Sequence, residues 1–180
     1  LSIFKPNLLV MKKYLIGLAL AVVGCQTQKP VTRIAFHEPI KPVKNEIREV
    51  ALHTEKALDI KLDNFGGRYY NLVDSPDKSV VAFMFDKDRD PTLADSGYRE
   101  QIHFEINTAN PEVELSGREL GKANVIFSRW CFCDRRTVGN FMVNDGTLSI
   151  KKENGKLRAR LKFKVPETTP IITELDVILE

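Results

Sequence analysis

The sequence predicts an all-β domain, an antiparallel β-sandwich or small barrel of about eight strands that ends in a C-terminal β-meander. After residue 56, apolar and polar residues alternate with a period of two, and no segment there shows a convincing helical period. Turn-forming Gly, Asn and Pro residues separate these segments. The 180 residues, 43% hydrophobic and 28% charged, are the size and composition of one globular domain with an additional segment at its start.

The first segment has the pattern of a secretory signal peptide. Met11-Lys12-Lys13 is a basic start, and residues 14–23 are uncharged and mainly apolar. A membrane-spanning helix needs about 20 apolar residues, so this stretch is too short to cross a bilayer. We expect translation to start at Met11, and residues 1–10 are left out of the fold prediction.

The end of this leader contains a candidate lipidation site. Val22-Val23-Gly24-Cys25 resembles the lipobox of bacterial lipoproteins. The resemblance implies that Cys25 receives a diacylglycerol thioether, followed by cleavage and N-acylation. Gln26 resembles the residue found in lipoproteins that are sorted to an outer membrane. The expected location is therefore a cell-envelope membrane, in particular the outer membrane on its periplasmic side, with the protein held there by its lipid anchor.

The predicted organisation has three parts. Residues 1–24 are upstream sequence and signal peptide, residues 25–45 a lipid-anchored flexible tether, and residues 46–180 a single all-β domain. The whole chain has 27 basic and 24 acidic residues. Three lysines and no acidic residues precede Cys25, so the chain from Cys25 onward has 24 of each. A balanced charge gives no argument for nucleic-acid binding, so no nucleic-acid partner is expected.

The individual strands follow from the alternation. Residues 46–54 fit either a strand or a short helix, and a Gly66-Gly67 turn separates two of the strands expected after them. The expected strands are 58–62, 68–73, 79–85, 102–106 and about 123–133.

The C-terminal third predicts a meander with a defined register. Asn154-Gly155 is a two-residue hairpin signal, and the segment from Pro166 to Pro170 links to a last strand over 171–179. One register places apolar residues on one face throughout. It pairs Leu148 with Leu161, Ile150 with Ala159, Leu161 with Leu175, Leu157 with Leu179 and Val165 with Ile171. The same register sets Arg160 opposite Asp176 and Lys162 opposite Glu174, so the basic stripe of this strand is expected to be neutralised. This organisation resembles the small all-β domains of uncharacterised bacterial cell-envelope lipoproteins.

Cys131 and Cys133 flank Phe132 in a presumed strand. As thiolates they could hold a soft metal, with His103 as a third ligand. An exported protein could instead join them in a disulfide, although alternate strand residues lie about 6.6–7 Å apart, at the edge of disulfide geometry. The third alternative, which we favour, is that one or both pack as small hydrophobic residues.

The loop from Asp86 to Gly97 spaces three carboxylates, Asp86, Asp88 and Asp90, as the start of a calcium loop does. The rest of the loop departs from that pattern, which favours an ordinary charged surface loop.

Aromatic residues provide the candidate ligand surface. Trp130 is expected in the core, whereas one of Tyr69 and Tyr70 must be exposed because neighbours on a strand face opposite ways. Tyr98 and Arg99 lie where the Asp86–Gly97 loop re-enters a strand, which makes them candidates for binding a sugar or an anionic group.

The sequence contains no G-x-S-x-G, no H-E-x-x-H and no phosphate-binding Gly loop, the motifs of common enzyme classes. The sequence therefore favours a non-catalytic binding or structural module for a glycan, a glycolipid or an envelope protein. A small metal-handling protein using Cys131 and Cys133 is the alternative, and a hydrolase with an unrecognised acid pair is a remote third.

Overall fold

The computed structural model describes residues 32–33, 35–36, 46–87, 92 and 96–179. The chain divides into two compact units, 1–30 and 31–180, and all described residues belong to the second. Met11 and the expected lipidation site at Cys25 lie outside the described residues, as does most of the expected tether.

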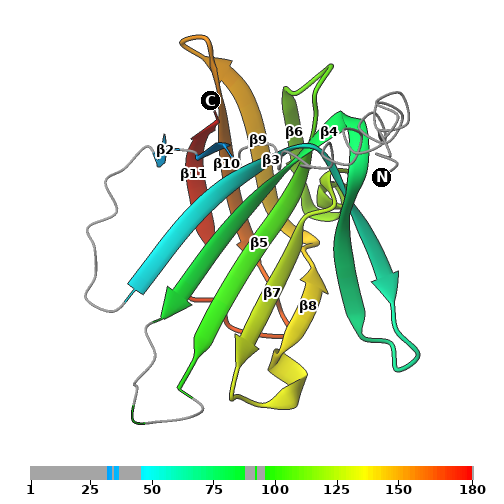
Figure 1. Ribbon diagram of the computed structural model, residues 1–180, viewed down its shortest axis with the longest axis vertical. Helices are drawn as coiled ribbons and strands as arrows, with labels where there is room; N and C mark the ends of the chain where they lie inside the picture. The colour runs from blue at the N-terminus through cyan, green and yellow to red at the C-terminus, as the bar shows by residue number, and fades with distance from the viewer. Residues whose placement is uncertain (1–31, 34, 37–45, 88–91, 93–95, 180) are drawn as a thin grey trace, which may run out of the picture. The chain divides into compact units, whose positions relative to one another are not determined.

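The second unit is all-β, as predicted, and its strands form two antiparallel sheets (Figure 1). Sheet A has the order β1 (Thr32–Arg33), β3 (Glu46–Leu62), β4 (Arg68–Lys87), β5 (Tyr98–Asn107), β7 (Ile126–Cys131) and β8 (Gly139–Met142). Sheet B has the order β2 (Ala35–Phe36), β11 (Glu174–Leu179), β10 (Lys156–Lys164), β9 (Asp145–Glu153) and β6 (Val113–Ser116). Two 3₁₀ helices, η1 (Gly117–Ala123) and η2 (Arg135–Thr137), complete the described elements. Strands β1 and β2 lie within the segment expected to be a tether and pair with the edges of the two sheets.

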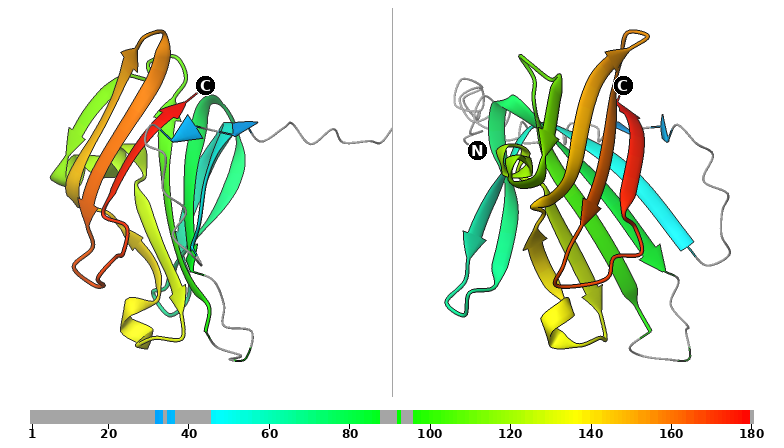
Figure 2. Two further views of the ribbon diagram at one scale, coloured as in Figure 1. Left: turned by 90° about the vertical axis from the view of Figure 1, so that its left-hand side faces the viewer. Right: turned by 180° about the vertical axis from the view of Figure 1, so that it is seen from behind.

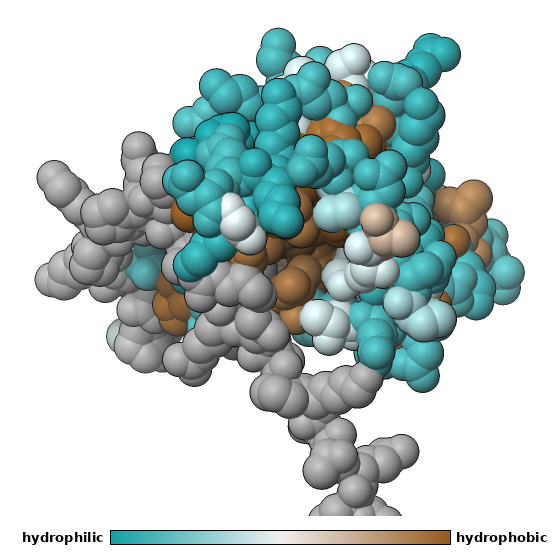
Figure 3. All heavy atoms as spheres, turned by 90° about the horizontal axis from the view of Figure 1, so that it is seen from above, coloured by the Kyte–Doolittle hydropathy of each residue, from teal (hydrophilic) through white to brown (hydrophobic). Residues whose placement is uncertain are grey.

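The sheets pack face to face as a sandwich, which Figure 2 shows from the side and from behind. The inner face of sheet A contributes residues such as Phe83, Phe104 and Phe127, and sheet B contributes residues such as Leu148 and Leu161. Burial of this apolar surface is the main force that holds the layers together. From above, Figure 3 shows hydrophobic side chains gathered in the middle of the face with hydrophilic ones around them.

Strands β3 and β4 are longer than expected and form one bent hairpin. Segments expected as separate strands are continuous, and the register shifts where Glu55, with a φ of 55°, lies opposite residues 75–78 of β4, a bulge that bends the ribbon without ending it. The far half of the hairpin contacts the outer face of sheet A, the face directed away from sheet B. A second apolar cluster forms there from Leu58, Val80 and Ile126. The hairpin ends in a turn in which Asp63 Oδ1 accepts hydrogen bonds from the backbone N–H groups of Phe65 and Gly67.

The C-terminal meander has the predicted register, including Arg160 opposite Asp176 and Lys162 opposite Glu174. Asn154 and Gly155 both have positive φ, at 52° and 82°, as a type I′ hairpin requires. Position 146 of the neighbouring strand β9 also requires a glycine, because a Cβ there would lie 2.1 Å from the backbone oxygen of Lys162.

The start of the last strand differs from the prediction. β11 begins at Glu174, so the expected pair of Val165 with Ile171 does not form. The backbone N–H groups of Ile171 and Ile172 instead donate hydrogen bonds to the carboxylate of Glu100 in sheet A. A contact between this link and sheet A thus replaces the expected start of the strand.

The segment 107–122, expected as a loop, contains β6 and most of η1. It follows the end of β5, whereas the charged loop after β4 precedes the start of β5. These two connections therefore lie at opposite ends of β5. Among the described residues, no helix is long and apolar enough to span a membrane.

Candidate functional site

A row of four side chains crosses the exposed part of the outer face of sheet A. Ile47 pairs with Asp86, Asp86 with Arg99, and Arg99 with Trp130. Directly paired residues of adjacent strands point to the same face of a sheet, so these four side chains are neighbours. The indole of Trp130 is 46% exposed, and Ile47 is 50% exposed. The expectation that Trp130 lies in the core is wrong, because it faces away from core residue Phe127.

An ion pair holds Arg99 in this row. Its Nε lies 3.2 Å from Oδ2 of Asp86, and Nη2 contacts the same oxygen. Both side chains remain partly exposed, at 42% for Arg99 and 21% for Asp86. The arrangement therefore presents a charged donor group and a carboxylate directly beside an exposed indole. Sheet strands hold all three, so little ordering is needed when a ligand binds.

The next row of the same face is polar and tied to the bent hairpin. Gln101 pairs with Ser128, and Ser128 pairs with Asn140. The hydroxyl of Ser128 donates to Oδ1 of Asn140 at 2.6 Å, and Nδ2 of Asn140 donates to the backbone oxygen of Arg68 at 2.6 Å. These bonds connect β7 and β8 to the start of β4. The half-buried Gln101 lies two residues from Arg99 along β5 and diagonally across from Trp130 of β7.

Further along this face, the hairpin covers a buried histidine. Nδ1 of His103 lies 3.1 Å from the Tyr70 hydroxyl, and the two ring centroids are 4.8 Å apart. Burial, with a smaller contribution from nearby His53, lowers the pKa of His103 to about 4. Burial also raises the pKa of Tyr70. His103 is therefore neutral at physiological pH, and its Nδ1 can accept the proton of the hydroxyl.

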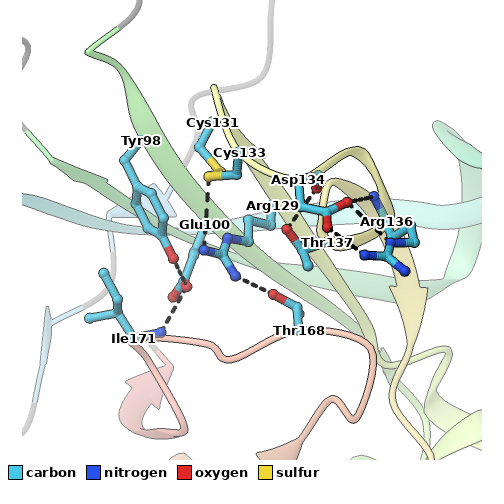
Figure 4. The surroundings of a disulfide bond; sticks show 10 residues. All are labelled: Tyr98, Glu100, Arg129, Cys131, Cys133, Asp134, Arg136, Thr137, Thr168 and Ile171. Carbon is cyan, nitrogen blue, oxygen red and sulfur yellow. Dashed lines mark hydrogen bonds and ion pairs between the residues drawn. A yellow bond between two sulfur atoms is a disulfide. The ribbon is translucent and has the colours of Figure 1, made fainter.

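On the inner face at the same end of the sheet, a buried carboxylate joins the two layers. Glu100 has no exposed surface and accepts hydrogen bonds from Ile171 N at 2.8 Å and Ile172 N at 2.9 Å. The Tyr98 hydroxyl donates to the same carboxylate (Figure 4). Burial and then this carboxylate raise the pKa of Tyr98, so the phenol stays protonated. The two backbone bonds dock the link between β10 and β11 onto sheet A, and the Tyr98 bond holds the carboxylate within β5.

A disulfide closes the end of β7. Cys131 and Cys133 are bonded, with their Cα atoms 5.3 Å apart. This separation is shorter than that of alternate strand residues, because β7 ends at Cys131 and the chain bends at the next two residues. The expectation that one or both cysteines pack as small hydrophobic residues is wrong, since the two are joined in a disulfide, with Cys133 exposed and Cys131 only half-buried.

The structure does not bring the three residues of the proposed soft-metal site together. Cys131 pairs with Tyr98 at one end of β5, whereas His103 is five residues further along the strand and on the opposite face. At about 3.3 Å per residue, that is roughly 16–17 Å of strand. Within the described part of the chain, no group of three or more His, Cys, Asp or Glu residues is arranged to hold a metal ion. Of the proposed calcium ligands, Asp86 pairs with Arg99, and Asp88 and Asp90 lie outside the described residues.

The four candidate ligand-binding residues do not form one site. Tyr98 faces the interior and Arg99 the outer surface. Tyr69 is exposed and Tyr70 half-buried, as the alternation required, but both lie on the far half of the hairpin. Only Arg99 belongs to the row that contains Trp130.

No protein-family model, no curated protein and no solved structure matches the chain.

Proposed function

We propose that the chain is an exported lipoprotein of a bacterial cell envelope, and that its all-β domain binds an envelope glycan through the exposed row Asp86, Arg99 and Trp130. The observation that carries the binding half of this proposal is the exposed indole of Trp130, beside a fixed guanidinium–carboxylate pair. The anchoring half depends on the leader and its lipobox cysteine, Cys25.

The disulfide supports export. Disulfides persist in oxidising compartments such as the periplasm and are rare where thioredoxin and glutathione keep thiols reduced. The bond between Cys131 and Cys133 thus agrees with the compartment that the signal peptide implies.

The outer-face row has the chemistry that a sugar ring requires. A sugar presents C–H groups on the faces of its ring and hydroxyl groups around its edge. An exposed indole can pack against the apolar face, as aromatic side chains with a polar neighbourhood do at many binding surfaces. Arg99 and Asp86 provide donors and acceptors for hydroxyls, and Arg99 can also pair with an acidic sugar.

The two alternative functions, a hydrolase and a metal-handling protein, have no comparable support. The buried carboxylates Glu100 and Glu105 lie on opposite faces of β5, so they do not face each other as the acid pair of a hydrolase would. Glu105 is engaged structurally, since it accepts hydrogen bonds from Leu58 N and Lys78 Nζ, both at 2.7 Å. The cysteines of the metal alternative are bonded to each other.

Binding of the purified chain to a panel of soluble peptidoglycan fragments and lipid-free envelope polysaccharides tests this function. Trp130→Ala should weaken binding to the recognised glycan by about tenfold or more, as loss of a central aromatic contact commonly does. Phe65→Ala is the matched control, because Phe65 is 96% exposed at the hairpin turn, away from the row. A second control reverses Arg158 and Arg160, whose partners are Glu153 and Asp176, and should leave binding intact.

Equal loss in the Trp130 and Phe65 variants, or loss only on reversal of the two arginines, would contradict the proposed surface. Binding to no glycan on the panel would replace the glycan with a protein partner.

A further inference from the structure

The disulfide at the end of β7 encloses a single residue. Cys131 and Cys133 flank Phe132, whose side chain is 84% exposed. The entropic stabilisation from a disulfide increases with the length of the loop that it closes, and this loop has only one residue between its cysteines. A stabilising role therefore explains little about this bond, whereas its exposed position leaves it open to chemistry.

An arginine is held beside one of the sulfur atoms. Nη2 of Arg129 lies 3.9 Å from Sγ of Cys133, and its Nη1 donates to the hydroxyl of Thr168 (Figure 4). The guanidinium also stacks 5.2 Å from the centre of the Tyr98 ring. Among the described residues, its buried Nε lacks a hydrogen-bond partner. A cation is thus fixed where reduction would place a thiolate.

This geometry favours one direction of bond cleavage. Thiolates form more readily next to an arginine, and a better-stabilised thiolate leaves faster in exchange. Cys133 is therefore the favoured leaving sulfur when the bond is attacked, and the favoured nucleophile once it is reduced. The partly exposed Cys131 is the sulfur that receives the attack.

We propose that Cys131 and Cys133 form a thiol–disulfide exchange site that acts on cysteine pairs of other polypeptides. A substrate thiolate bonds to Cys131 Sγ, the bond between the two protein sulfurs breaks, and Cys133 leaves as a thiolate beside Arg129. A second substrate thiolate then attacks the substrate sulfur of the mixed disulfide and releases Cys131, which takes up a proton. Two electrons pass from the substrate dithiol to the protein disulfide, so the substrate is oxidised and the cysteine pair reduced.

The surroundings favour a polypeptide over a small thiol as substrate. Phe132, which is exposed between the two cysteines, offers an apolar contact to an extended chain. This inference does not depend on glycan binding, since it concerns the sulfur atoms and the inner-face Arg129.

The test uses the full chain with Cys25→Ser, which leaves only the two cysteines in question of the three in the sequence. The oxidised protein is mixed with a reduced, unstructured peptide that contains two cysteines, quenched with acid, alkylated and weighed by mass spectrometry. We expect peptide disulfide and protein thiols to appear together.

Arg129→Gln should slow the exchange by about tenfold or more near neutral pH, because it removes the charge but keeps a hydrogen-bonding side chain. Arg136→Gln is the matched control, because Arg136 lies in η2, just after the disulfide, and pairs with Asp134 at 2.8 Å. Circular dichroism shows whether each variant folds. If Arg129→Gln does not fold, Arg129→Lys takes its place and should keep most of the parent's exchange rate.

A synthetic peptide of residues 128–136 in its disulfide form provides the reference rate. Exchange by the folded chain that is no faster than that of this peptide would overturn the proposal, as would equal rates for Arg129→Gln and Arg136→Gln.

Discussion

The hydroxyl of Tyr70 lies 3.1 Å from Nδ1 of His103, and this contact joins the far half of the β3–β4 hairpin to the outer face of sheet A. The two residues are 33 positions apart in the chain, and the bulge at Glu55 brings them together. Because burial holds the pKa of His103 at about 4, the histidine is neutral in the folded protein near neutral pH.

The first prediction concerns acid stability. The pKa of His103 is about 4 when folded and near 6.5 when unfolded, so the unfolded chain binds a proton that the native chain excludes. The free energy of unfolding should therefore fall as the pH decreases from 6.5 to 4, by about 3 kcal/mol in total from this group. Urea denaturation at a series of pH values measures this slope.

His103→Gln provides the comparison, because it removes the titrating group and keeps polar atoms for Tyr70. We expect a shallower pH dependence between 6.5 and 4 in this variant, whatever its absolute stability. His53→Gln should change the slope less, since the pKa of His53 is lowered in a less buried position. Identical slopes in the parent and the His103 variant would show that His103 is not buried as described.

The second prediction concerns the carboxylate that docks the β10–β11 link. Glu100→Gln keeps the shape but replaces one acceptor oxygen with an NH₂ group, which would face an N–H or O–H donor. Leaving buried polar groups unsatisfied should lower the free energy of unfolding by about 1–3 kcal/mol. Glu167→Gln, at an exposed position of the same link, should change it little. Equal denaturation midpoints for the two variants would contradict the role assigned to Glu100.

The third prediction concerns the anchor. A diacylglyceryl group plus an N-acyl chain exceeds the two attachment signals that stable membrane binding needs. The mature chain should therefore fractionate with membranes, and Cys25→Ser should give a soluble or uncleaved species. Unchanged fractionation and unchanged electrophoretic mobility in this variant would argue against lipidation.

Much of the fold could be predicted because it depends on local alternation. The meander register follows from apolar residues at every second position and from the Asn154-Gly155 turn, and the structure has that register. The late start of β11 could not be predicted, because the N–H groups of Ile171 and Ile172 bond to Glu100, about 70 residues away in the chain. The bent hairpin was missed for a similar reason, since a bulge interrupts the alternation without ending the strand.

The site was predicted less well than the fold. Arg99 was expected at a binding surface, but Trp130 was assigned to the core because aromatic residues in all-β domains are usually buried. The face of Trp130 follows from its neighbours: Phe127 faces the core, and three positions further along a strand the side chain points the opposite way. That signal was present in the sequence, but it required knowing which face of the strand was buried.

The most direct test of the central claim is the fluorescence of Trp130, the one tryptophan in the chain. The full chain is titrated with the soluble glycan that it binds, while calorimetry measures the affinity independently. The account predicts a saturable change in the emission of Trp130 with the same dissociation constant, and at least a tenfold weaker affinity in Arg99→Ala. Full saturation of binding by calorimetry with no change in Trp130 emission would place the glycan elsewhere and contradict the proposed site.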